Sequence, residues 1–143
     1  MRDMQTAKDI LTQRKLTLVI VKNGKVLFET DSPRISGFIK AIDSLGNELK
    51  GASVADRVVG KAIALLCVYS GIREVYAEVL SKKAKTMLEK YSIPVEWNEL
   101  VDNVLDLTKT GMCPLEKVAE GISDPKESYT AFKAMQEKMK KCK

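Results

Sequence analysis

Two strand-forming runs, residues 16–21 and 25–30, are separated by the dipeptide Asn23-Gly24. Asn-Gly readily adopts the positive φ angles of a tight two-residue turn, so this pattern predicts an antiparallel hairpin. Helical and strand patterns alternate after the hairpin, and each strand–helix–strand connection makes its two strands parallel. We therefore expect one α/β domain over residues 1–143, a three-layer sandwich with a mixed sheet and an N-terminal hairpin.

The spacing of apolar residues predicts the remaining elements. Residues 98–110 fit neither a helix nor a strand pattern alone, and a short helix is expected to begin at Pro114. The other expected helices cover residues 3–14, 35–45, 54–69 and 82–91, with a last helix that begins within residues 123–127, and further strands cover residues 74–80 and 93–97.

The expected helix over residues 54–69 is the most informative of these. Ser53 and Asp56 match a capping box, in which Ser53 is the N-cap and Asp56 the third helical residue. Beyond Lys61 the segment is apolar on all sides as far as Val68. A helix without a polar face is buried, so we expect it to pack in the centre of the domain.

The polar residues at the start of this expected helix form a candidate anion site. Arg57 and Lys61 are one turn apart and share a helix face, where their charges oppose the helix dipole unless an anion lies between them. Gly60 allows close approach of a ligand. We expect Ser53, Arg57, Gly60 and Lys61 to bind a small anion. The alternative is a solvated helix end, in which Asp56 only caps.

The chain has no histidine, and its three cysteines, Cys67, Cys113 and Cys142, are far apart in the sequence. This composition excludes histidine-based acid–base chemistry and zinc sites, so we expect no metal and no cofactor. The cysteine usage fits a reducing cytoplasm. Cys113 precedes Pro114 at an expected helix start, where free N–H groups stabilise a thiolate. It is the candidate nucleophile; the alternative is a capping thiol without chemistry.

The charge and hydropathy of the chain limit its partners. The formal charge is +5, and five lysines lie in the last eleven residues, which we interpret as a solvated helix end rather than a nucleic-acid surface. No apolar run is long enough to cross a membrane. The scattered aromatic residues Tyr76, Tyr91, Trp97 and Tyr129 are expected in the core. The sequence does not fix the oligomeric state and is compatible with a homo-oligomer.

Three blocks of sequence resemble a known prokaryotic family. They are Gly-Ala-Ser-Val-Ala-Asp-Arg-Val-Val-Gly-Lys-Ala at residues 51–62, Val-Leu-Ser-Lys-Lys-Ala at 79–84 and Thr-Gly-Met-Cys-Pro-Leu-Glu at 110–116. Over residues 16–134 the chain is similar to a family of domains of unknown function that has a cytidine-deaminase-like fold. The first block is the specific one.

The resemblance implies a site related to that of the deaminases, but without zinc. Active deaminases carry H-x-E at the start of one helix and P-C-x-x-C at the start of the next. The corresponding blocks here are Val54-Ala55-Asp56 and residues 80–84, which contain no histidine and no cysteine. Asp56 falls where the proton-shuttling glutamate would lie. The resemblance thus implies that zinc-dependent deamination is not available to this chain.

Two functions remain open. The chain either binds and processes a nucleotide or phosphorylated sugar without a metal, or it is a non-catalytic regulatory or binding module that kept the pocket. In the first case Arg57 and Lys61 hold the anion, and Asp56 and Cys113 supply the chemistry. Nucleic-acid binding through the lysine-rich tail is a third, more distant alternative.

Overall fold

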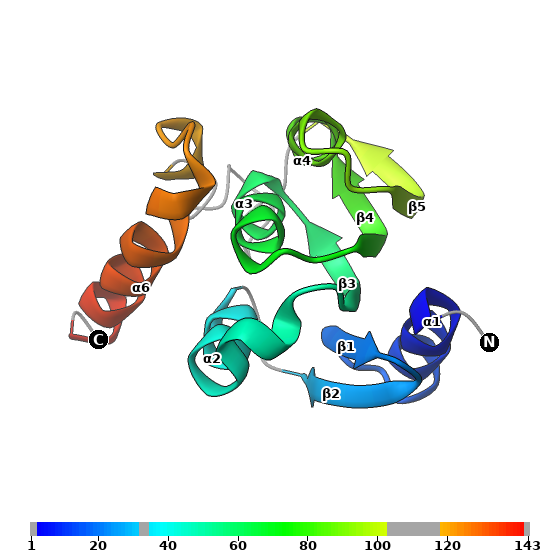
Figure 1. Ribbon diagram of the computed structural model, residues 1–143. Coiled ribbons are helices and arrows are strands. Elements are labelled where there is room, and N and C mark those ends of the chain that lie inside the picture. Colours follow the sequence, from blue (N-terminus) through cyan, green and yellow to red (C-terminus); the bar gives the residue numbers. More distant parts are fainter. Residues whose placement is uncertain (1–2, 32–34, 103–117, 142–143) are drawn as a thin grey trace.

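The computed structural model describes residues 3–31, 35–102 and 118–141, with side chains as far as residue 137. The elements alternate as the sequence predicts (Figure 1). In chain order they are α1 (Asp3–Gln13), β1 (Leu18–Lys22), β2 (Lys25–Thr30), α2 (Ser36–Leu45), the 3₁₀ helix η1 (Gly46–Leu49), β3 (Ser53–Val59), α3 (Lys61–Ser70), β4 (Glu74–Ser81), α4 (Lys82–Lys90), β5 (Val95–Val101) and α6 (Pro125–Lys141).

The five strands form one mixed sheet with the order β2-β1-β3-β4-β5. β1 is antiparallel to both β2 and β3, whereas β3, β4 and β5 are parallel to one another. The predicted hairpin is confirmed: Asn23 and Gly24 have φ angles of 53° and 77°, as a two-residue turn requires. The carboxylate of Asp3 accepts a 2.8 Å hydrogen bond from each of their backbone N–H groups, and so joins α1 to the turn.

Helices cover both faces of the sheet, which confirms the predicted three layers. Figure 1 shows α1 on one face, α2, α3 and α4 on the other, and α6 outside α3. The α1 face has a small core of seven buried residues that includes Leu11, Val19 and Tyr76. The opposite face has the main core, which Phe132 of α6 joins. The mixed α/β fold class predicted from the sequence is therefore correct.

The central helix begins later than predicted. Residues 53–59 form strand β3, and α3 starts only at Lys61, so the helix predicted over residues 54–69 was wrong in its first half. Neither Ser53 nor Asp56 is a capping residue. β3 lies between β1 and β4, and residues 53–56 are all buried, so this part of the strand lacks the alternation of polar and apolar residues that marks a half-buried strand. The buried character of residues 62–67 was predicted correctly.

The helix and strand ends on either side of this region follow the sequence signals more closely. Ser81 caps α4, because its Oγ accepts a 3.1 Å hydrogen bond from the backbone N–H of Ala84. β5 begins just after Pro94 and continues to Val101, beyond the predicted end at residue 97. Among the helices of the described ranges, none is long and apolar enough to cross a membrane.

Candidate functional site

Two helices begin together at one edge of the sheet. α3 follows β3 after the single residue Gly60, and α4 follows β4 directly at Ser81. Because β3 and β4 are parallel, their carboxyl ends and the first turns of both helices lie at the same edge. The first N–H groups of a helix have no partner within the helix, and ligands of open α/β sheets bind beyond the carboxyl ends of the strands.

A cavity of about 680 Å³ lies at this edge and is lined mainly by lysines, so we call it the lysine cavity. Lys61 comes from the first turn of α3, while Lys82, Lys83 and Lys90 come from α4. Glu120 is the carboxylate among the described lining residues. The described part of the wall therefore carries four cations and one anion. Its other lining residues are Thr86, Met87 and Ser123.

Two of these lysines make ion pairs at the rim. The Nζ of Lys82 lies 2.8 Å from Oδ1 of Asp102, which raises the pKa of Lys82 and lowers that of Asp102. Lys83 pairs with Glu120. All four side chains are more than 40% exposed. Exposed pairs of this kind contribute little to stability, so an anionic ligand can exchange with their carboxylates at small cost.

The predicted anion-binding residues are only partly brought together. Lys61 lines the lysine cavity and Gly60 precedes it as the N-cap of α3. Arg57 was predicted to share a helix face with Lys61, which was wrong: it lies in β3, and its Nη1 is 3.1 Å from Oε2 of Glu78 in β4. Ser53 donates a 2.6 Å hydrogen bond to Glu74 at the start of the two strands.

Asp56 is a buried acid in the middle of the sheet. It pairs with Leu18 of β1 and Ala77 of β4, and its Oδ1 accepts a 3.2 Å hydrogen bond from the backbone N–H of Val58. Burial raises its pKa to about 7. Burial, together with the charge of Asp56, also raises the pKa of the Cys67 thiol in α3.

Two further predictions concern chemistry at these positions. Asp56, the predicted proton shuttle, is not among the described residues that line the lysine cavity. Cys113, the predicted nucleophile, lies outside the described residues. The proposed match of Val54-Ala55-Asp56 to a motif at a helix start was wrong, because these residues lie within β3. Within residues 3–31, 35–102 and 118–141, no three His, Cys, Asp or Glu side chains converge as metal ligands.

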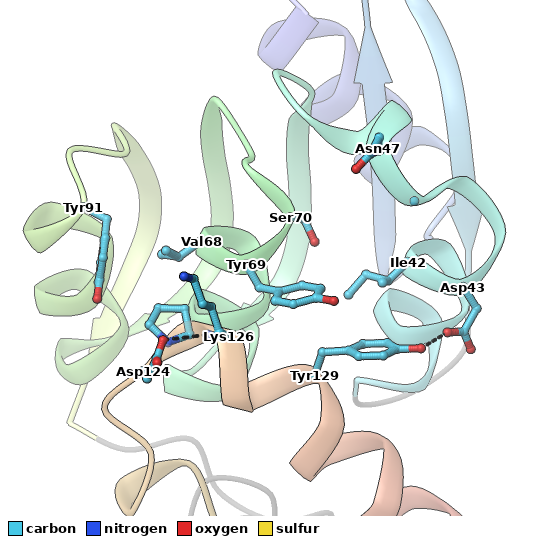
Figure 2. Close-up of a pocket in the computed structure, with 12 residues that line it drawn as sticks. Ile42, Asp43, Asn47, Val68, Tyr69, Ser70, Tyr91, Asp124, Lys126 and Tyr129 are labelled. Atoms are coloured by element: carbon cyan, nitrogen blue, oxygen red, sulfur yellow. Dashed lines mark hydrogen bonds between the residues drawn. The ribbon is translucent and has the colours of Figure 1, made fainter.

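A second and larger cavity, of about 880 Å³, lies between the end of α2, the end of α3 and the start of α6 (Figure 2). We call it the tyrosine cavity, because Tyr69, Tyr91 and Tyr129 line it. The rings of Tyr69 and Tyr129 are stacked, with centroids 5.4 Å apart and planes at 7°. The Tyr129 hydroxyl donates a hydrogen bond to Asp43, and Lys133 lies 3.1 Å from the same carboxylate.

Sequence reasoning missed the tyrosine cavity. Tyr76 lies in the core as predicted, and Tyr129 is partly buried and packs against the main core while it also lines the cavity. Tyr91 and Trp97 are each more than a third exposed, so their assignment to the core was wrong. The three tyrosines belong to α3, α6 and the residue after α4, which are distant in the sequence. Only the packing of α6 against α3 brings them together, and no local motif indicates it.

Comparison with known proteins connects this architecture to a family. The family model for a domain of unknown function, DUF1893, matches residues 6–139. A crystal structure of a DUF1893 family protein from Thermotoga maritima is similar with a TM-score of 0.85 and 26% identity, over 93% of this chain and 89% of that one. No curated protein matches the sequence.

Similarity to deaminases is weaker. A dCMP deaminase from the cyanophage S-TIM5 matches with a TM-score of 0.50 and 14% identity, over 66% of this chain and 93% of the deaminase. A Thermotoga maritima diaminohydroxyphosphoribosylaminopyrimidine deaminase/reductase matches with a TM-score of 0.45 and 20% identity, over 67% of this chain and 35% of that one. The dCMP deaminase shares the fold alone at this identity. The protein thus belongs to the DUF1893 family of domains of unknown function, whose fold here is deaminase-like.

Proposed function

We propose that this protein binds a small anionic ligand that carries phosphate, and that the phosphate lies in the lysine cavity. The observation that carries the proposal is the convergence of Lys61, Lys82 and Lys83 at the edge where α3 and α4 begin. Lys90, at the other end of α4, lines the same cavity. Like charges in one cavity repel one another, and a bound anion relieves that repulsion. The positive ends of two helix dipoles favour the same charge.

The two functions left open by the sequence differ in whether chemistry follows binding. A general acid or base must come within hydrogen-bonding distance of the reacting group. Asp56 is buried in the sheet, hydrogen-bonded to backbone, and does not line the cavity. Among the described lining residues, Glu120 is the carboxylate, and it is paired with Lys83. These contacts support a binding module rather than a processing enzyme.

The proposal is tested by titrating inorganic phosphate and pyrophosphate into the protein by calorimetry. The double variant Lys61→Ala/Lys83→Ala removes one cation from the first turn of each helix. We expect it to lower the pyrophosphate affinity by about tenfold or more, since hydrogen bonds to charged groups contribute about 1.5–3 kcal/mol each.

The matched control is Lys25→Ala/Lys40→Ala, which removes the same charge from exposed positions in β2 and α2. It should bind pyrophosphate as the unmodified protein does. Raising the salt concentration should weaken binding in both the control and the unmodified protein. Equal affinity in the two double variants, or no binding by the unmodified protein, would overturn the proposal.

A further inference from the structure

The lysine cavity and the tyrosine cavity adjoin on two sides. Lys90 lines the lysine cavity, and the next residue, Tyr91, lines the tyrosine cavity. In the same way, Ser123 lines the first and Asp124 the second. These neighbours belong to two separate segments, the end of α4 and the residues before α6. These neighbouring lining residues favour a single groove of which the two cavities are consecutive parts.

Helix α3 gives the groove its length. Lys61, in the first turn, lines the lysine cavity, and Tyr69, near the last residue, lines the tyrosine cavity. Eight residues of α-helix span about 12 Å. An inorganic phosphate or a sugar phosphate is too short to occupy both ends. A ring joined through a sugar to a chain of phosphates has a comparable length.

The tyrosine cavity is suited to a flat ring. Figure 2 shows the Tyr69 and Tyr129 rings stacked, with Tyr91 on the far side of Val68 and Lys126. The hydrogen bond from Tyr129 to Asp43 fixes the stacked pair before any ligand binds. Aromatic rings stack on bases of every type, because each base has a π face.

Polar groups in the same wall can contact the edge of such a ring. The side chain of Asn47, which can both donate and accept hydrogen bonds, lines the cavity. Ser70 lines it too, and its Oγ is buried without a hydrogen-bond partner among the described residues. A buried hydroxyl without a partner is uncommon, and a small rotation of the Ser70 side chain toward the cavity would let a ligand supply one.

The charges around the rings favour a neutral ring over an organic cation. The Nζ of Lys133 lies 5.5 Å from the centre of the Tyr129 ring, and that of Lys90 lies 5.7 Å from the Tyr91 ring. The protein's own cations thus already face the electron-rich sides of two rings. Lys126 adds a third cation to the wall.

We infer that the ligand is a nucleotide with more than one phosphate, whose base lies in the tyrosine cavity and whose phosphates lie in the lysine cavity. This inference rests on the proposed function, because it places the phosphates at the same lysines. It adds the second half of the site and the chemical class of the ligand.

The test compares nucleoside triphosphates with inorganic tripolyphosphate by calorimetry. ATP, GTP, CTP and UTP are each titrated into the full chain. We expect at least one of them to bind about tenfold more tightly than tripolyphosphate, since stacking of a single base on an aromatic side chain supplies an effect of this size. One of the single variants Tyr69→Leu and Tyr91→Leu, the one that removes the ring on which the base stacks, should abolish most of that difference, and both should leave tripolyphosphate binding unchanged.

The matched control is Trp97→Leu, which removes a comparably exposed ring outside both cavities and should bind all probes as the unmodified protein does. The Lys61→Ala/Lys83→Ala variant should bind both nucleotides and tripolyphosphate more weakly than the unmodified protein does. If tripolyphosphate binds as tightly as every nucleotide, the inference is overturned while the proposed function stands. If neither class binds, both are overturned.

Discussion

The raised pKa of the Asp56 carboxyl group predicts how the stability of the protein depends on pH. Its pKa is about 7 in the folded protein, against an ordinary value of 3.8, because burial penalises the charged form. Between about pH 4 and pH 7 the folded state keeps a proton that the unfolded state has released. The free energy of unfolding should therefore fall as the pH rises through this range, by about 4 kcal/mol from this group.

Asp56→Asn isolates that contribution, because the amide is neutral and its Oδ1 can still accept the hydrogen bond from Val58. Urea denaturation at pH 5 and pH 8 should show the variant more stable than the unmodified protein at pH 8, and close to it at pH 5. The carboxylates with lowered pKa, Asp43 and Asp102, titrate below this range and are present in both proteins. Parallel pH profiles for the two proteins would contradict the assignment.

The residues of the candidate site show what a sequence can and cannot predict. Lys61 was identified because a cation near a helix start suggests an anion, and that argument needs only local positions. The lysines of α4 were not identified, because their place beside Lys61 depends on the parallel pairing of β3 with β4. The position of Arg57 was predicted wrongly because residues 53–59 form a strand. Residues four apart share a face only within one helix, so Arg57 in β3 does not share a face with Lys61 in α3.

The fold class was predicted correctly from the sequence, whereas its central strand, β3, was predicted to be part of a helix. The pattern Ser-x-x-Asp imitates a capping box, and the four residues that carry it are all buried, so they show no alternation that would contradict a helix. The signals that favour a strand are the β-branched residues Val54, Val58 and Val59 and the break at Gly60. The order of the other predicted elements within the described ranges was correct, because hairpin, cap and breaker signals are local. The 3₁₀ helix η1 was not predicted, and the helix predicted to begin at Pro114 lies outside the described residues.

The start of α2 is packed closely against the end of β2 at Gly37. A Cβ atom at this position would lie 2.6 Å from Cγ2 of Thr30, a branched side chain with little freedom to move. Gly37→Ala should therefore destabilise the protein by about 1–3 kcal/mol, even though alanine favours a helix over glycine.

The partner variant Thr30→Ser removes the contacting methyl group and keeps the hydroxyl. The double variant Gly37→Ala/Thr30→Ser should recover most of the loss, which urea denaturation of the two single variants and the double variant measures as a coupling energy. Additive effects of the two substitutions would show that Thr30 is not what excludes a side chain from position 37.

Across the whole molecule, the central strands of the sheet are much more deeply buried than the edge strand β5. β3 pairs with a neighbour on each side and carries the buried residues Val54 and Ala55, which belong to the cores of opposite faces. β5 pairs only with β4 among the described strands, and most of its side chains are exposed, including Trp97 and Leu100. The sequence signals are correspondingly weak at this edge, where the predicted strand was too short.

This difference in burial predicts that the backbone hydrogen bonds of β5 open more often than those of β3. Amides of β3 should exchange with solvent only when the whole domain unfolds, because both flanking strands and both helical layers must separate first. Amides of β5 can be released by fraying of one edge, so their exchange should be about tenfold faster or more. Native-state hydrogen exchange followed by NMR or mass spectrometry measures both groups in one experiment. Equal protection of β3 and β5 would mean that β5 is held by contacts other than its pairing with β4, and the domain would then open as one cooperative unit.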